Sequence, residues 1–180
     1  MSLLEIFSSI PDPRIERTKL YSVSQILILS VLSYLCGHTG YRGIKRFGDA
    51  HSGLLYDMLG LARVPSHVTL RAVLQRIDKN ALTAAFHQWT ASFSPPRSTW
   101  LGGDGKTLCS TVENAHNKNQ DFEAVVSLFA HDSGLVQVIG DYKNKSKGTG
   151  EQHIIRFLVG QLKDMGAVIT LDALHTQKKQ

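Results

Sequence analysis

Residues 100–109, Trp-Leu-Gly-Gly-Asp-Gly-Lys-Thr-Leu-Cys, are the stretch that indicates the fold most clearly. Their apolar and glycine-rich composition predicts a strand with Asp104 inside it. The following segments are apolar or amphipathic, and we interpret them as two strands, a helix and a strand, at 122–131, 135–142, 151–165 and 167–171. Asp-Ser-Gly at 132–134 is typical of a hairpin turn. The order predicts a three-strand meander followed by a right-handed crossover.

The sequence before the Pro-rich breaker at 94–98 predicts only helices. Hydrophobic periodicity, serine or aspartate caps and terminal glycines place them at about 22–36, 41–51, 54–59 and 66–77, with a further one after Asp78. The pair 54–59 and 66–77 has helix-turn-helix proportions, although ordinary helix packing explains the same pattern. Cationic or polar residues on the outward faces are our candidate DNA contacts: His67, Arg71, Gln75, Arg76, Arg42, Lys45 and Arg46, with Lys106 in the first strand.

The two regions differ in net charge. The chain of 180 residues has a net charge of +5. Residues 1–96 hold ten Lys and Arg against six Asp and Glu, and residues 97–180 hold ten against nine. We therefore expect an α+β protein with a helical, DNA-binding or associated domain at 1–96 and an α/β domain at 97–180. A modest basic excess is compatible with phosphate contacts, but it is also common on solvated surfaces.

Several protein classes are excluded by composition. The apolar stretch at 26–36 is shorter than the ~20 residues that a membrane span needs. The N-terminus lacks the pattern of a signal peptide, and two isolated cysteines form no disulfide framework. A cytoplasmic protein, nucleoid-associated in a bacterium, is the expectation.

Two carboxylates lie at apolar strands. Asp104 is within the first strand, and Asp172 directly follows the run at 168–171. Because a strand before a crossover and the strand after it are natural parallel neighbours, both side chains are expected at one end of the sheet. Carboxylates in close apposition repel unless a divalent cation lies between them, and Mg²⁺ favours such ligands. Glu151 is a tentative third metal ligand, with a helix-start acid of no ligand role as the alternative.

Short motifs distributed along the chain resemble one family. They are Ile-Pro-Asp-Pro-Arg at 10–14, Pro-Ser-His-Val-Thr at 65–69, Asp-Gly-Lys-Thr-Leu at 104–108 and Thr-Leu-Asp-Ala at 170–173. Together they are similar to the ISAs-type insertion-sequence transposases, the group that includes the H-repeat-associated proteins. The resemblance implies a helical DNA-binding region followed by a ribonuclease H-like core. It also implies that Asp104 and Asp172 are the first two acids of a catalytic Asp-Asp-Glu metal triad, and Glu151 matches a family glutamate at the start of the first core helix.

The activity implied for an intact relative is DNA transposition by Mg²⁺- or Mn²⁺-dependent strand cleavage and transfer at element ends. Cys109 stands where the family usually has arginine, and the sequence stops at Gln180, before the third acid. We therefore expect an incomplete core that binds metal weakly or not at all and is inactive alone. Expected partners are terminal inverted-repeat DNA and either a second copy or a full-length transposase. A DNA-binding regulatory or inhibitory module and a small metal-dependent nuclease using the three acids are the alternatives.

Overall fold

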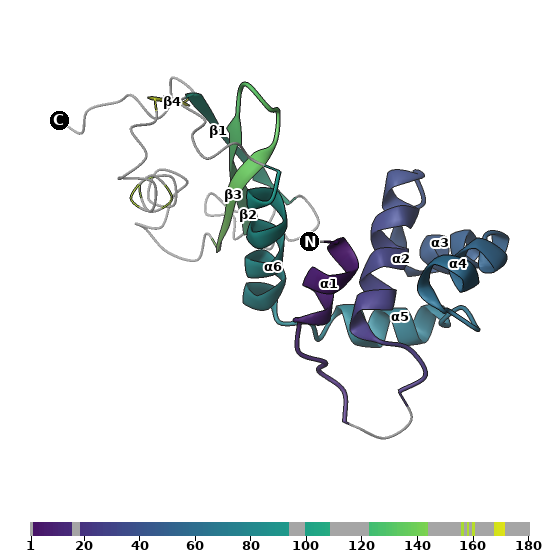
Figure 1. Cartoon of the computed structure of the whole chain (residues 1–180). Coiled ribbons are helices and arrows are strands. Elements are labelled where there is room, and N and C mark those ends of the chain that lie inside the picture. Colours follow the sequence, from purple (N-terminus) through teal and green to yellow (C-terminus); the bar gives the residue numbers. More distant parts are fainter. Residues whose placement is uncertain are drawn as a thin grey trace. The chain divides into compact units, whose positions relative to one another are not determined.

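The computed structural model describes residues 2–15, 19–93, 100–108, 123–143, 156, 158, 160 and 168–171. The chain divides into two units, Met1–Trp89 and Thr90–Gln180 (Figure 1). The first unit is helical and the second contains a mixed four-stranded sheet. The predicted α+β class is therefore confirmed at the level of mixed helix and sheet.

The helical unit contains the predicted helices and a short one that the sequence analysis missed. Their bounds are α1 Leu3–Ser8, α2 Val23–Leu35, α3 Gly40–Ala50, α4 Ser52–Leu59, α5 His67–Leu74 and α6 Lys79–Ala91. A capping box of Ser22 with Gln25 begins α2, and Gly60, at φ +64°, ends α4. The missed helix α1 begins with the same device, formed by Ser2 and Glu5.

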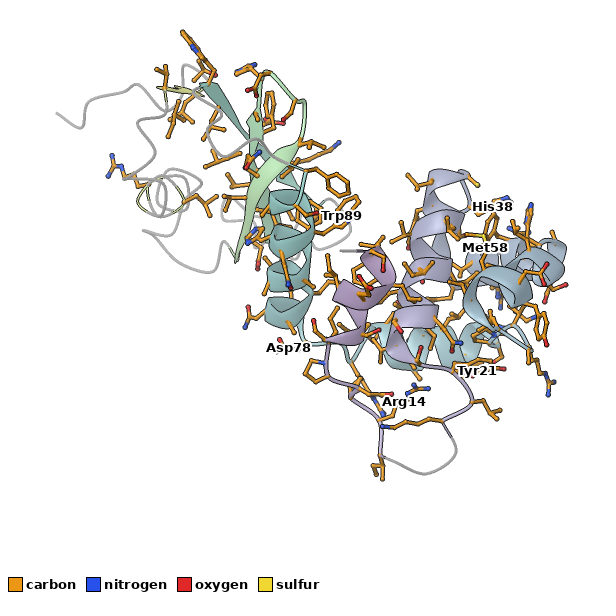
Figure 2. The ribbon with its side chains drawn as sticks, viewed as in Figure 1. Arg14, Tyr21, His38, Met58, Asp78 and Trp89 are labelled. Carbon is orange, nitrogen blue, oxygen red and sulfur yellow. The ribbon has the colours of Figure 1, made fainter. Side chains whose placement is uncertain are left out.

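Helix α5 is shorter than predicted. We expected it to continue to Ile77, but it ends at Leu74, and the Arg76 amide donates a hydrogen bond to the Val73 carbonyl at 3.0 Å. Asp78 then begins α6, because its Oδ1 accepts the Asn80 amide at 3.0 Å; Asp78 and Trp89 are labelled in Figure 2. Helix α5 packs against α3 and α2 rather than forming a close pair with α4. This arrangement favours ordinary helix packing over the helix-turn-helix interpretation.

One hydrophobic core holds the helical unit together. Ile26 and Leu29 of α2, Ile44 of α3 and Leu70 of α5 are all inaccessible to solvent. Among the described residues, no single helix is long and apolar enough to cross a membrane; α2 and α3 pass that test only as a pair bent by 94°.

Helix α3 lies unusually close to the segment that leads into α5. A Cβ added at Gly48 would lie 2.6 Å from Val64 Cγ1, well inside van der Waals contact. Only a residue without a side chain permits this approach, so Gly48 and Val64 set the spacing of the two elements.

The strands of the second unit are β1 Trp100–Thr107, β2 Glu123–Ala130, β3 Val136–Lys143 and β4 Val168–Leu171. Their order is β3-β2-β1-β4 (Figure 1). β1 pairs antiparallel with β2 and parallel with β4, which confirms that the first and last strands are parallel neighbours. Of the helix predicted at 151–165, residues 156, 158 and 160 are described, and all three are helical.

The two faces of the sheet differ. Leu101, Val126, Leu128 and Ala130 are buried on one face together with Leu158 of the helical segment. Gly102, Asp104 and Lys106 of β1 lie on the opposite face. Asp104 is exposed there, which corrects the interpretation of a carboxylate enclosed in an apolar strand.

Candidate nucleic-acid interface

A pocket of about 510 Å³ lies between the N-terminal part of α3 and that of α5. We call it the basic pocket, and its lining residues are Thr39, Gly40, Tyr41, Arg42, Gly43, Arg46, His67, Val68 and Arg71. Four of the eight predicted DNA contacts, Arg42, Arg46, His67 and Arg71, therefore line one cavity. Thr39, Tyr41 and Val68 line the same cavity, although no pattern in the sequence indicated them as contacts.

The packing of α3 and α5 explains why these cations converge. Ile44 and Phe47 turn one side of α3 into the core, so Arg42 and Arg46, four residues apart, lie together on the outer side. Leu70 is buried on α5 in the same way, which leaves Arg71 exposed. Helices α3 and α5 thus both contribute outward-facing side chains to the same pocket.

The charge of the basic pocket is uncompensated. No acidic residue lines it, and within the described part of the chain Arg42, Arg46 and Arg71 have no ion-pair partner. Lys45, by contrast, pairs with Asp49 one turn further along α3. Cations without acidic partners attract polyanions more strongly than paired ones.

Helix α3 adds a further positive element. Its N-cap residue, Thr39, makes no side-chain hydrogen bond to the first turn, and Thr39, Gly40 and Tyr41 all line the pocket. Helix α5 is capped, because Ser66 Oγ accepts the Thr69 amide at 3.1 Å. The uncapped amides of α3 and the helix dipole favour an anion beside the three arginines.

The other predicted DNA contacts lie elsewhere. Gln75 and Arg76 are exposed just beyond the C-terminal end of α5, outside the pocket. Lys106 is exposed on β1 in the second unit. The arginines and His67 are therefore the predicted residues that the fold brings together.

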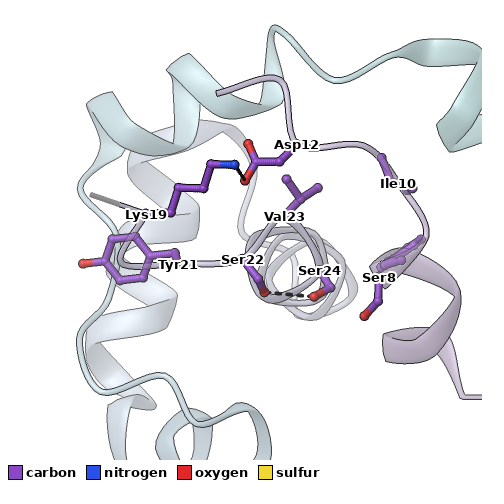
Figure 3. Close-up of a pocket in the computed structure, with 9 residues that line it drawn as sticks. Ser8, Ile10, Asp12, Lys19, Tyr21, Ser22, Val23 and Ser24 are labelled. Carbon is purple, nitrogen blue, oxygen red and sulfur yellow. Dashed lines mark hydrogen bonds and ion pairs between the residues drawn. The ribbon is translucent and has the colours of Figure 1, made fainter. Parts of the chain in front are cut away.

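A second pocket, of about 450 Å³, lies where the loop after α1 meets the start of α2 (Figure 3). Asp12, within the Ile-Pro-Asp-Pro-Arg motif, accepts hydrogen bonds from Arg14 Nε at 2.9 Å and Nη2 at 2.7 Å. Lys19 Nζ lies 3.6 Å from Asp12, and Arg14 also donates to the Tyr21 carbonyl. The motif therefore ties this loop together, and its acid is compensated by two cations.

Because of Asp12, the free energy of unfolding is expected to fall at low pH. Its hydrogen bond from the Arg14 side chain lowers the pKa from 3.8 to about 2. A carboxyl with a lowered folded-state pKa stabilises the fold above its unfolded pKa and loses that effect as pH falls through the folded pKa. Because Asp12 is partly exposed, we expect a loss of about 1 kcal/mol between pH 4 and pH 2. Urea unfolding of the wild type and Asp12→Asn tests this; a difference between them that stays constant over pH 2–6 would contradict it.

The predicted metal ligands are only partly described. Asp104 is exposed and has no hydrogen-bond or ion-pair partner among the described residues. Asp172 and Glu151 lie outside the described residues. Within the described ranges, no three His, Cys, Asp or Glu side chains come together as a metal site.

The register of β1 and β4 bears on the two aspartates. Gly103, the residue before Asp104, pairs with Leu171, the residue before Asp172. The parallel pairing runs without interruption from Trp100 opposite Val168 to this point. The described part of the sheet thus brings β4, whose last residue precedes Asp172 in the sequence, beside β1, which carries Asp104.

Residues from both units match known proteins. Residues 4–90 match the family described as "DDE_Tnp_1-associated". Two relatives from Escherichia coli (strain K12), the "H repeat-associated putative transposases" YhhI and YbfD, are 29% and 28% identical over 178 residues each, 98% of this chain. An "uncharacterized protein in dhlA 3'region" of Xanthobacter autotrophicus is 39% identical over 87 residues, 47% of this chain.

The chain matches a different share of the length of each relative. The chain spans 30% of the Xanthobacter protein, 46% of YhhI and 68% of YbfD. It therefore covers less than half the length of the first two.

Proposed function

Because this chain belongs to the insertion-sequence transposase family, we propose that it acts in DNA transposition and that its helical unit holds DNA at the basic pocket. The observation that carries this proposal is the convergence of Arg42, Arg46 and Arg71, without acidic partners in the described chain, on one cavity. Guanidinium groups bind phosphate oxygens with two parallel hydrogen bonds, which suits them to the DNA backbone.

A backbone phosphate fits the pocket on chemical grounds. Its negative charge would be stabilised by the uncapped first turn of α3 as well as by the arginines. The arginines come from two helices, so one DNA strand lying along the pocket would contact both helices. This arrangement favours binding to a nucleic-acid backbone over binding to a single small anion.

Salt dependence of DNA binding tests the proposal. With three phosphate contacts, log Kobs should fall against log[salt] with a slope of about −2.7, or about fortyfold between 50 and 200 mM salt. Fluorescence anisotropy with duplex DNA from the ends of the element measures this slope. In Arg71→Ala the slope should be shallower by about 1, whereas in Arg63→Ala, an exposed arginine outside the pocket, it should be unchanged. A wild-type slope near zero would refute the proposal.

For the second unit we propose a ribonuclease H-like core in which Asp104 and Asp172 hold a divalent metal ion. The support is the register: continued by one residue, it would set Asp172 beside Asp104, and parallel neighbours point to the same face. The Asp104 carboxylate fits a Mg²⁺ or Mn²⁺ ligand, because it is exposed and unpaired within the described part of the chain. Such an ion, when bound, would activate the attacking oxygen and stabilise the leaving one.

Within this proposal the protein's own residues have separate tasks. The basic pocket would hold DNA through its backbone, and the two aspartates would bind the metal. Glu151 remains a predicted further ligand. We propose that the helical unit binds element ends through the basic pocket, which includes the role of a regulatory module beside another transposase copy.

A further inference from the structure

Helix α5 presents an exposed face whose composition differs from that of the rest of the basic pocket. Val68, Arg71 and Ala72 of α5, with the C-cap residue Gln75, follow the spacing i, i+3, i+4 and i+7, and all four are exposed. Leu70 and Val73 form the opposite, buried side. The exposed face therefore combines a guanidinium, an amide and small apolar groups, whereas the α3 wall supplies Arg42 and Arg46.

Val68 is the unusual member of this face. Its side chain is 63% exposed, although it lies in the first turn of α5 beside His67 in a basic wall. A cation or polar residue there would serve phosphate binding equally well. An apolar side chain forms no hydrogen bond with a phosphate, so within this wall Val68 is available for an apolar contact.

Resting on the proposed function, we infer that this face of α5 reads base edges in the major groove and that Val68 contacts the C5 methyl of a thymine. The thymine methyl is the distinctive apolar group of that groove, and Gln pairs with adenine edges there. An eight-residue helix is ~12 Å long, close to the width of the major groove. Helix α5 would enter the groove from its place against α3, without α4 as a helix-turn-helix partner. Arg42 and Arg46 on α3, together with Arg71 on α5, would then hold the flanking backbone.

Replacing thymine by deoxyuracil removes only the methyl group and so isolates this contact. A duplex is first selected from a random-sequence library with the wild-type chain, and each thymine is then changed singly to deoxyuridine. At one thymine of the selected site we expect the wild type to lose about fourfold in affinity. Val68→Ser should bind both duplexes equally, while Val68→Thr, which keeps one methyl group, should retain a preference for thymine.

Met58→Ser is the matched control. Met58 of α4 is 56% exposed and lies outside the basic pocket, so this variant should keep the wild-type preference. Circular dichroism should show unchanged thermal unfolding for Val68→Ser, since the side chain is mostly exposed.

The outcomes separate the two proposals. If Val68→Ser keeps the thymine preference, if no thymine shows one, or if selection enriches no sequence, the inference about α5 is wrong. None of those results would contradict salt-dependent binding that responds to Arg71→Ala. The proposed backbone contact would then remain supported. If neither salt nor Arg71→Ala affects binding, the DNA-holding role itself fails.

Discussion

Removing the three arginines of the basic pocket together should reduce affinity for duplex DNA by about a hundredfold at 50 mM salt. Arg42, Arg46 and Arg71 lie on two helices but line one cavity, and the described chain offers them no acidic partner. An exposed arginine that binds a phosphate contributes ~1 kcal/mol to the free energy of binding, and three contribute ~3 kcal/mol. The salt slope should fall to near zero at the same time, because few counterions are then released on binding.

The control for this triple alanine variant is a change of charge elsewhere. Arg63 and Arg156 are exposed arginines outside the pocket, so a double alanine variant of these lowers the net charge with the pocket intact. We expect it to bind within about threefold of the wild type. Equal reductions in affinity for both variants would mean that overall charge, and not the pocket, attracts DNA. Urea unfolding should show that the triple variant is as stable as the wild type, since all three side chains are exposed.

Replacing Asp104 by asparagine should weaken the binding of Mn²⁺ to the second unit at least tenfold. The substitution keeps the size of the side chain but removes the anionic oxygen that a divalent ion prefers. A single remaining carboxylate holds such an ion poorly, so we expect the affinity for Mn²⁺ to fall at least tenfold. Electron paramagnetic resonance of free Mn²⁺, titrated with the full chain, measures the bound fraction directly.

Asp141→Asn provides the comparison for the metal site. Asp141 lies on β3, two strands away from Asp104 in the same sheet. It should leave Mn²⁺ binding unchanged, and Asp172→Asn should reproduce the effect of Asp104→Asn. Binding that survives both aspartate substitutions would remove the proposed metal site and leave the DNA-holding role as the supported one.

Much of the secondary structure could be predicted because its signals are local. The capping serines, Gly60 and the apolar spacing of α2 and α3 are all readable within one turn of the helix they define. The end of α5 could not be predicted, because the pattern continues to Ile77 while hydrogen bonds beyond Leu74 tighten into a turn. Hydrophobic periodicity indicates which residues can face the core, but it does not indicate at which residue a helix ends.

The basic pocket could be predicted only in part. Outward cations on single helices follow from helical spacing, but the approach of residue 42 to residue 71 depends on tertiary packing. The exposure of Asp104 could not be predicted for another reason. Gly103 stands on the buried face of β1, where Leu128 and Leu171 occupy the space that a side chain would take, so the usual alternation of apolar and polar residues is absent.

The close approach of Gly48 to Val64 has a consequence for how such proteins diversify. A Cβ at position 48 would lie 2.6 Å from Val64 Cγ1, so a larger residue there would push α3 away from the stretch of chain that enters α5. Neither Gly48 nor Val64 lines the basic pocket, whose cations come from other positions. The spacing of these two elements and the charge of the pocket therefore depend on different residues, and a substitution can change one of them without the other.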